Sequence, residues 1–206
     1  MKLLIVAATL QELSGVFAHF GLAPLNFVQH ENFDVVITGV GMTATAFALG
    51  KILHNGYSVV LNVGIAGSFD PNIPIGNLVQ VSSDCFAELG AEDHDSFITI
   101  NDLGFGTNTF AASTIIPTLP QVKGITVNTV HGSAESIAKV SHLFNVQIES
   151  MEGAAVFYAC HQEGIPCAQV RAISNYVEPR NKENWQIGLA VKNLNDWLIT
   201  YLSLLA

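Results

Sequence analysis

Cationic side chains are scarce in this sequence of 206 residues, and arginine is the rarest of them, since only Arg171 and Arg180 occur. Eight Lys and Arg residues stand against seventeen Asp and Glu residues, which gives a formal net charge of −9 at pH 7. Binding to nucleic acid or to an anionic membrane surface depends on clustered cations. We therefore expect neither nucleic acid nor a membrane as a partner.

Cysteine is also rare, and long apolar runs are absent. Cys85, Cys160 and Cys167 are odd in number and share no metal-ligand spacing, so we interpret them as reduced thiols of a cytoplasmic protein. The apolar run Leu3–Ala8 does not make a signal peptide, because polar residues follow at positions 11 and 12. No stretch approaches the roughly 18–20 consecutive apolar residues that span a membrane.

Apolar residues, in contrast, make up 50% of the chain, which suits one large core and a single domain over residues 1–206. Short runs rich in Val and Ile alternate with helix-like stretches, and this pattern predicts an α/β fold with a mostly parallel, covered sheet. Gly56 and Gly164 follow two of the helices, where a left-handed cap is expected. The expected strands are Leu3–Ala8, Asp34–Thr38, Ser58–Val63, Asn77–Ser82, Gly124–Val130, Val146–Glu149 and Cys167–Ile173, and the expected helices are about Thr9–Phe20, Thr43–Asn55, Ala134–Phe144, Gly153–Glu163 and Glu183–Leu205.

A glycine motif joins the second strand to its helix. The segment Thr38–Ala44 reads TGVGMTA, which has the GxGxxA form of a dinucleotide-binding turn. That fingerprint also needs an acidic residue at the end of the next strand, and Ser58–Gly64 carries none. Close packing of the helix against the strand explains the glycines equally well.

Other polar residues follow strands. Glu12 lies just after the first strand, and Glu152 opens a helix directly after another. Each acid taken singly is explained by the helix dipole. The acidic stretch Ser83–Thr109 is expected to be irregular, either a functional loop at the strand ends or a solvated excursion.

Taken together, these segments resemble the nucleoside phosphorylase and nucleosidase superfamily, and within it the methylthioadenosine/S-adenosylhomocysteine nucleosidase branch. The resemblance covers nearly the whole chain in the family's order. It implies a three-layer α/β/α sandwich with a mixed central sheet, cleavage of purine nucleosides at the N-glycosidic bond, and no metal or organic cofactor. It also implies a homodimer whose partner completes the site. The matching segments are the early Glu12, the turns Gly39–Gly41 and Val63–Ser68, Met151–Glu152 and Arg171–Asn175.

The resemblance implies a role for each matching residue in the hydrolysis. Glu12 corresponds to the glutamate that holds and deprotonates the attacking water, and Arg171 to the arginine beside it, whose charge favours the carboxylate form. Glu152 corresponds to the carboxylate that binds the ribose hydroxyls, and Met151 packs against the sugar. An oxocarbenium-like transition state needs both a base for water and help for the leaving group.

The same resemblance places residues around the base. Ala66 and Gly67 correspond to the turn against the base, and Asn175, preceded by Ser174, to the position that contacts purine N7. Ile65 stands where adenosine-type relatives often have serine, so the water site differs. The neutral amide of Asn175 can donate to N7 or O6, which favours a 6-oxopurine over adenine.

Three expectations remain open. The segment between residues 132 and 152 is shorter than in these relatives, so the aromatic residue that stacks on the base has no clear match, and Phe86 or Phe105 is a candidate. Arg180 either binds a carboxylate on the distal part of the substrate or forms a surface salt bridge with Glu178. An adenine-releasing nucleosidase and a non-catalytic nucleoside-binding module are the alternative functions.

Because phosphorylases bind phosphate through early arginines and none precedes Arg171, water is the expected nucleophile.

Overall fold

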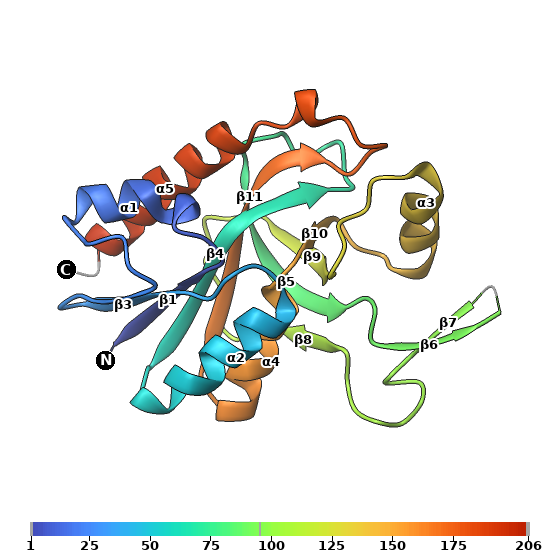
Figure 1. Cartoon of the computed structure of the whole chain (residues 1–206), viewed down its shortest axis with the longest axis horizontal. Helices are drawn as coiled ribbons and strands as arrows, with labels where there is room; N and C mark the ends of the chain where they lie inside the picture. The colour runs from blue at the N-terminus through green and yellow to red at the C-terminus, as the bar shows by residue number, and fades with distance from the viewer. Residues whose placement is uncertain (1, 95, 205–206) are drawn as a thin grey trace.

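A mixed β-sheet with helices on both faces forms the protein, and the computed structural model describes residues 2–94 and 96–204 (Figure 1). Over these residues the sheet has nine strands in the order β10-β9-β5-β11-β4-β1-β3-β2, with β8 paired to β5. The strands are β1 (Leu3–Ala7), β2 (Phe27–Gln29), β3 (Phe33–Ile37), β4 (Val59–Ser68), β5 (Leu78–Phe86), β8 (Thr109–Ala111), β9 (Gln121–Thr126), β10 (Ile148–Ser150) and β11 (Cys167–Tyr176). The helices are α1 (Ser14–His19), α2 (Met42–Ile52), α3 (Ala134–Leu143), α4 (Gly153–Glu163) and α5 (Ile187–Ser203), with 3-10 turns η1 (Gln11–Leu13), η2 (Leu53–Asn55) and η3 (Lys182–Asn184).

The alternation of side chains along β1 builds two separate cores. Successive residues of a strand point to opposite faces. Leu3 and Ile5 pack in the cluster that includes α1 and α5, whereas Leu4 and Val6 pack in the cluster with α2 and α4. All of these side chains are buried, so both faces of the sheet are covered and the predicted three-layer arrangement is confirmed.

Several predicted elements are confirmed in detail and others are wrong in extent. Helix α4 has the predicted bounds, and Gly56 and Gly164 adopt the expected left-handed conformation, with φ of 81° and 64°. The main sheet is mostly parallel, as predicted, since β1–β3, β1–β4, β4–β11, β5–β9 and β9–β10 are parallel pairs. It is nevertheless mixed, because β2–β3, β5–β8, β5–β11 and β4–β10 are antiparallel pairs. The expected last helix starts later, at Ile187, and its predicted end Leu205 lies outside the described residues.

The sheet also closes on itself around its second half. Strand β10 pairs with β9 in parallel and with the end of β4 in antiparallel orientation, which completes a ring of β4, β11, β5, β9 and β10. To make this ring, β4 and β5 extend beyond their predicted ends, to Ser68 and Phe86. The cluster of Ala66, Val79, Val81, Val122, Ile148 and Ile173 fills it.

The acidic stretch between β5 and β8 is more ordered than the sequence predicts. It contains a two-stranded hairpin, β6 (Gly90–Asp93) and β7 (Ser96–Thr99), which projects from the body beside α3 (Figure 1). Phe105 follows the hairpin and is 78% exposed. Among the described residues, no helix is both long and apolar enough to cross a membrane.

Candidate active site

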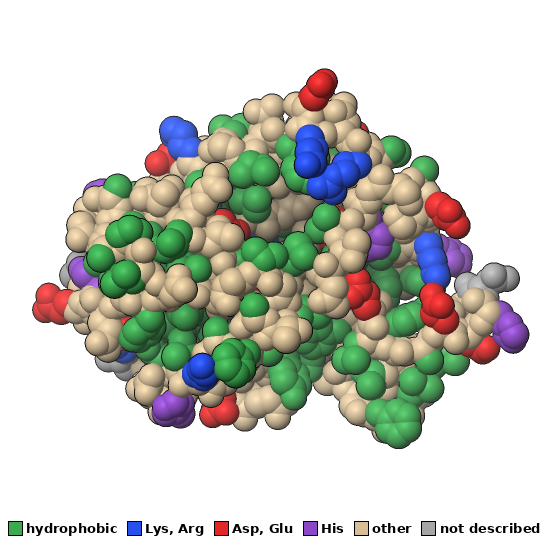
Figure 2. All heavy atoms as spheres, viewed as in Figure 1, with side chains coloured by type: hydrophobic (Ala, Val, Ile, Leu, Met, Phe, Trp, Pro, Cys, Tyr) green, Lys and Arg blue, Asp and Glu red, His purple; other side chains and the backbone are tan. Residues whose placement is uncertain are grey.

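A cavity of about 380 Å³ opens where β1, β4, β10 and β11 end, and Figure 2 shows this hollow beside basic side chains. Most of the site residues predicted from the sequence line it, although they come from positions far apart in the chain. These are Glu12, Ile65, Ala66, Gly67, Met151, Glu152, Ser174, Asn175 and Arg180. Arg171 lies behind the wall and is 1% exposed, and Phe86 lies elsewhere.

Glu12 is held at the cavity wall by three hydrogen bonds. The backbone N–H and the hydroxyl of Thr9 donate to Oε2, at 2.9 and 3.1 Å, and the backbone N–H of Ile65 donates to Oε1, at 3.2 Å. Burial raises the pKa of Glu12, while Arg171 and these donors act in the opposite direction. The result is an oriented carboxylate that binds a proton more readily than a free glutamate does.

The last helix fixes the turn that carries Glu12. Asn195 of α5 is buried, and its amide nitrogen donates to the backbone oxygen of Glu12 at 2.8 Å. Its amide oxygen accepts from the backbone N–H of Val16 at 2.8 Å. Gly15 permits this approach, because a Cβ there would lie 2.9 Å from the Asn195 Cβ.

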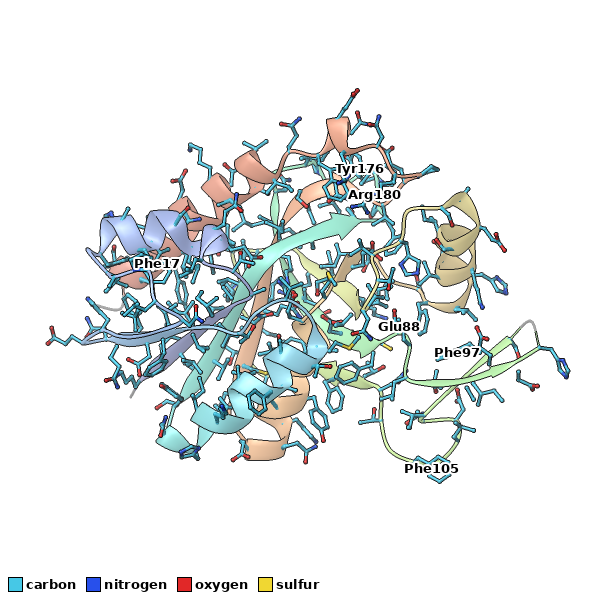
Figure 3. All side chains as sticks on the ribbon, in the orientation of Figure 1. Phe17, Glu88, Phe97, Phe105, Tyr176 and Arg180 are labelled. Carbon is cyan, nitrogen blue, oxygen red and sulfur yellow. The ribbon has the colours of Figure 1, made fainter. Side chains whose placement is uncertain are left out.

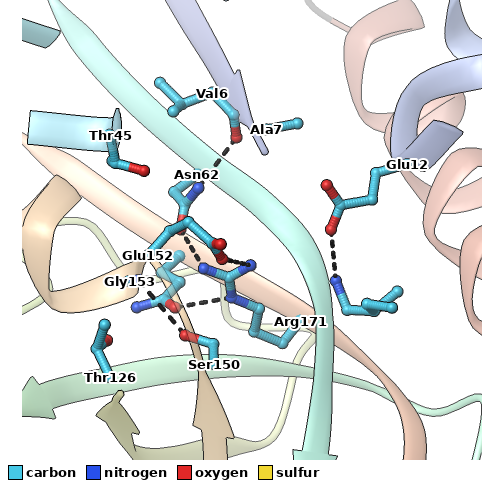
Figure 4. A network of polar contacts seen from close by, with 12 residues as sticks. Val6, Ala7, Glu12, Thr45, Asn62, Thr126, Ser150, Glu152, Gly153 and Arg171 are labelled. Carbon is cyan, nitrogen blue, oxygen red and sulfur yellow. Dashed lines mark hydrogen bonds and ion pairs between the residues drawn. The ribbon is translucent and has the colours of Figure 1, made fainter. Parts of the chain in front are cut away.

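Arg171 is a buried cation in the middle of a polar network (Figure 4). Its Nε donates to Gln169 at 2.8 Å, its Nη2 donates to Asn62 at 2.7 Å, and Nη1 lies 3.9 Å from Glu152 Oε2. A Cβ on Gly64 would overlap Nη1 of Arg171 and come within 2.7 Å of Glu12 Oε1. Gly64 thus leaves the space in which the guanidinium and the Glu12 carboxylate approach each other.

A further buried acid supports this network from behind. Asp84 accepts hydrogen bonds from Thr126 and Gln169, both at 2.9 Å, and Gln169 in turn contacts Arg171. Complete burial raises the pKa of Asp84, against the effect of these donors and of Arg171. Asp84 does not line the cavity, so it acts on the site indirectly, through Gln169 and Arg171 and through Thr126, whose hydroxyl accepts a hydrogen bond from the Ala154 backbone N–H.

The first glycine turn contacts Glu152 directly. The backbone N–H of Gly41 donates to Glu152 Oε1 at 3.0 Å, and Gly41 has φ of 95°, a conformation that favours glycine. Close packing also contributes, because a Cβ on Gly39 would lie 3.4 Å from that of Ala44. The GxGxxA motif therefore orients a carboxylate in this fold, and the acid that a dinucleotide site requires is missing from β4.

Asn175 points into the cavity because β11 contains a bulge. The pairing of β11 with β4 shifts between Ile173 and Asn175, so that Ser174 is the additional residue. The Ser174 hydroxyl donates to Asn175 Oδ1 at 2.7 Å and lies 3.2 Å from the backbone oxygen of Ala66. Asn175 Nδ2 donates to the backbone oxygen of Tyr176 at 2.9 Å. With its oxygen held by Ser174, the amide presents N–H to a ligand.

The lining residues that the sequence interpretation missed include an interacting titratable pair, His131 and Glu149. Their side chains meet at 2.6 Å between Nδ1 and Oε2, and the His131 backbone N–H donates to Oε1 at 3.0 Å. Burial raises the pKa of Glu149, and His131 opposes this effect. The available signal was the position of Glu149 two residues before Met151–Glu152, one of the segments that carry the family resemblance.

Arg180 lies at the mouth of the cavity, and Figure 3 shows it close to the end of β11. Its guanidinium carbon is 4.8 Å from the centre of the Trp185 ring, and both residues line the cavity. No ion pair of Arg180 is found within residues 2–94 and 96–204, and Glu178 instead accepts a hydrogen bond from Asn184 at 2.7 Å. The expected salt bridge between Arg180 and Glu178 is therefore absent from this part of the chain.

The prediction that Phe86 contributes to the site is wrong. Its ring packs edge-on against Phe110 and Tyr158, at 6.1 and 6.3 Å between ring centres. Because side chains alternate along β5, Phe86 faces α4, and its neighbour Cys85 lies in the cluster with α3. Phe105 is also remote from the cavity, in the loop between β7 and β8 (Figure 3). Trp185 is an aromatic residue that does line the cavity.

The described residues contain no group of three or more His, Cys, Asp or Glu side chains arranged to hold a metal ion. The acids of the cavity are instead bound by hydrogen-bond donors and by Arg171. This arrangement is suited to proton transfer and to stabilising positive charge on a ligand.

Comparison with known proteins agrees with this geometry. The model of the phosphorylase superfamily matches residues 27–203. Futalosine hydrolase of Streptomyces coelicolor is 34% identical over 185 residues, which cover 81% of this chain and 77% of that protein. Futalosine hydrolase of Thermus thermophilus is 27% identical over 174 residues, covering 79% and 77%.

Solved structures share the fold at lower identity. The 5'-methylthioadenosine/S-adenosylhomocysteine nucleosidase of Helicobacter pylori with butyl-thio-DADMe-Immucillin-A has a TM-score of 0.83 at 19% identity, covering 98% of both chains. The native futalosine hydrolase of the same organism has a TM-score of 0.82 at 18% identity, covering 98% of this chain and 97% of that one.

From the sequence alone, three segments are expected to match futalosine hydrolases best, namely residues 87–93, 149–155 and 174–180. The last two supply lining residues of the cavity, and the relative at 34% identity is an enzyme of that kind. The chain therefore belongs to the phosphorylase superfamily and, within it, to the futalosine hydrolase family of N-glycosyl hydrolases.

Proposed function

We propose that this protein hydrolyses the N-glycosidic bond of futalosine and releases hypoxanthine and dehypoxanthinyl futalosine, a step of menaquinone biosynthesis. The observation that carries this proposal is one cavity lined by Glu12, Glu152 and the amide of Asn175, with Arg171 buried behind it. Similarity to futalosine hydrolases supports the same substrate.

In this mechanism Glu12 is the general base. Water attacks C1′ of the ribose and transfers a proton to the Glu12 carboxylate, while the bond between C1′ and N9 breaks and the base takes its electron pair. Arg171 favours the ionised form of Glu12, which is otherwise disfavoured by burial. Glu152, oriented by Gly41, binds the ribose hydroxyls beside Met151 and stabilises positive charge on the sugar.

Asn175 assists the departure of the base. Its amide nitrogen donates to N7 as negative charge develops there, and it needs no proton from solvent to do so. An aspartate at this position would have to be protonated before it could donate to a 6-oxopurine. Ala66 and Gly67 line the cavity next to Asn175, and we assign them to the face of the base.

The charges of the site favour water over phosphate as the nucleophile. Arg171 is already bound to Gln169 and Asn62, and Arg180 lies at the mouth against Trp185. A phosphate near C1′ would meet the Glu12 and Glu152 carboxylates without a bidentate arginine partner. We expect activity that does not depend on phosphate and that chelators do not change.

Arg180 and Trp185 fit the distal half of futalosine, an aryl carboxylate linked through a ketone chain to the ribose. The guanidinium matches a carboxylate bidentately, and the indole ring provides an apolar surface for an aryl group. Ile187 and Val191 extend this apolar wall of the cavity.

The protein is proposed to act as a cytoplasmic homodimer of single-domain chains over residues 1–206. Exposed apolar side chains support self-association, because large apolar groups at the surface mark contact sites. They occur on α2 and α4, where Phe47 and Tyr158 are 65% and 43% exposed, and on the projecting segment at Phe105. Figure 2 shows apolar side chains gathered over the face of α2 and α4.

An adenine-releasing nucleosidase remains the second candidate, since methylthioadenosine nucleosidases share the fold. A non-catalytic nucleoside-binding module is disfavoured by the base at Glu12 and the buried Arg171, which binding alone does not need. Release of free base from futalosine, inosine and methylthioadenosine in phosphate-free buffer separates these functions. Hypoxanthine release from futalosine at the highest kcat/KM is the expected result, and a preference for methylthioadenosine would replace the proposal with the second candidate.

Substitution of the amide tests the choice of base directly. We expect Asn175→Asp to shift the ratio of cleavage from futalosine towards its 6-amino counterpart, because a carboxylate accepts from the amino group but repels O6. The two rates are measured in parallel on one preparation, so the fraction of active enzyme cancels. An unchanged ratio would remove Asn175 from recognition of the base.

A further inference from the structure

Three adjacent strands place Asn175, Gly67 and Glu149 in one row across the sheet. Gly67 of β4 pairs with Asn175 of β11 on one side and with Glu149 of β10 on the other. Side chains at paired positions of neighbouring strands point to the same face. A Cβ on Gly67 would lie 2.9 Å from Val177 Cγ2, 3.2 Å from Asn175 Nδ2 and 3.7 Å from Glu149 Cγ, so Asn175 and Glu149 border the space beside this glycine together with the apolar side chain of Val177.

This row has a donor at one end and an acceptor at the other. Asn175 presents N–H, because its oxygen accepts from the Ser174 hydroxyl. Glu149 is buried in the cavity wall and accepts two hydrogen bonds, both from His131. A carboxylate has about four lone-pair sites, so Glu149 keeps capacity to accept from a ligand. The proposed mechanism uses Glu12 and Glu152 and leaves Glu149 without a role.

The edge of a 6-oxopurine complements such a row. This edge offers the acceptors N7 and O6, followed by the donor N1–H. In adenine, N1 carries no hydrogen and is an acceptor. The Asn175 amide can donate to N7 or O6. The N1–H group then needs an acceptor at the other end of the row, where Glu149 lies. Neighbouring strands are about 4.8 Å apart, so the backbones of the outer two strands of the row lie about 9.6 Å apart, which leaves room for a purine and its hydrogen bonds to the two side chains.

We propose that Glu149, held in place by His131, accepts the N1–H of a 6-oxopurine base lying over Gly67. This inference rests on the proposed function, since it assumes that the base is released in this cavity. Glu149 determines specificity by contacting the base, and His131 is a positioning residue that acts through Glu149. Adenine would bring its N1 lone pair against the carboxylate, which adds to the discrimination provided by Asn175.

The test compares futalosine with its 6-amino counterpart in wild type and in Glu149→Gln. A hydrogen bond to a charged group of this kind corresponds to a loss of about 10- to 100-fold when it is removed. We expect kcat/KM for futalosine to fall by about that factor, and the 6-amino compound to be cleaved as well or better, because the Gln amide donates to N1. Glu163→Gln, an exposed carboxylate at the end of α4, is the matched control and leaves both rates unchanged.

The ratio of the two rates is independent of how much of a variant is folded. A merely structural role for Glu149 lowers both rates together and leaves the ratio unchanged, which would overturn the inference. His131→Asn, which keeps a donor towards Glu149, is expected to retain the wild-type ratio, and His131→Leu is expected to lower it. Equal ratios in the Asn and Leu variants would remove His131 from positioning.

Failure of the proposed function gives a different result. In that case the wild-type enzyme itself releases no hypoxanthine from futalosine. If wild type does release hypoxanthine and Glu149→Gln keeps the wild-type ratio, the hydrolysis stands and the assignment of Glu149 alone is wrong.

Discussion

Replacing the carboxylate of Glu12 by an amide separates its chemical role from its structural one. In Glu12→Gln the side chain keeps its shape but cannot accept the proton of the attacking water. Loss of a positioned general base lowers turnover by about 10²- to 10⁴-fold. We expect a decrease in kcat of this size in hypoxanthine release from futalosine. The hydrogen bonds from Thr9 and Ile65 position Glu12 itself, so the other carboxylates that line the cavity do not replace it as the base.

The effect on stability follows from the same three hydrogen bonds. The donors from Thr9 and Ile65 approach the two carboxylate oxygens from different sides, and an amide has only one oxygen. In either orientation its NH₂ group faces a backbone N–H, and a lost hydrogen bond to a charged group costs about 1.5–3 kcal/mol. Relief from burying a charge offsets this cost. We therefore expect thermal unfolding of Glu12→Gln close to that of wild type near neutral pH.

The pH dependence gives an independent check with a definite sign. Burial raises the pKa of Glu12, so the folded protein binds this proton more tightly than the unfolded chain does. The contribution of Glu12 to stability is thus fully present at low pH and is lost as the pH rises through the folded pKa. Activity runs in the opposite direction, because the base must be ionised.

The acid limb of kcat/KM should therefore lie above the ordinary glutamate pKa in wild type and should disappear in Glu12→Gln. Near-wild-type turnover of the variant, or an acid limb that persists in it, would refute the assignment of Glu12 as the base.

Three further predictions concern neighbouring positions. We expect Glu152→Gln to lower kcat and kcat/KM together, since its charge acts on the cationic sugar, and an increase in KM alone would assign it to ground-state binding. Gly64→Ala is expected to reduce kcat at least tenfold without removing a functional group, because its Cβ comes within 2.7 Å of Glu12 Oε1. Gly50→Ala, which has open space around its Cβ, is the matched control, and equal activity of the two variants would contradict the steric argument. We expect Arg180→Ala to raise KM for futalosine and to leave cleavage of inosine, which lacks the distal carboxylate, nearly unchanged; equal losses on both substrates would assign Arg180 to structure.

Residues within continuous motifs were predictable from the sequence. Glu152 directly precedes a helix whose bounds were predicted to the residue, so its place at a strand-to-helix junction followed from local patterning. The place of Glu12, as the acid after the first buried strand, was predictable for the same reason, whereas the roles of both acids followed from the family resemblance. Local hydrophobic period and glycine positions carry this information without knowledge of the tertiary structure.

Contacts that depend on strand pairing were not predictable. Alternation fixes which face of a strand is buried, but not which strand lies beside it. The pairing of Glu149 with Gly67 exists only because β10 closes the ring against β4. The bulge at Ser174 and the burial of Phe86 against α4 depend on a single residue of register, which composition does not reveal.

The bond from Asn195 to the turn of Glu12 has a consequence for how activity arises during synthesis. The first functional side chain of the chain is placed by its last helix, through a hydrogen bond between positions 183 residues apart. A nascent chain that lacks α5 has the glycine turns, Glu152 and Arg171, but its Glu12 turn lacks the hydrogen bonds that the Asn195 side chain makes to Glu12 and Val16. We therefore expect hydrolysis to begin only after α5 has been synthesised and has packed against this turn, and we expect chains that end before α5 to be inactive.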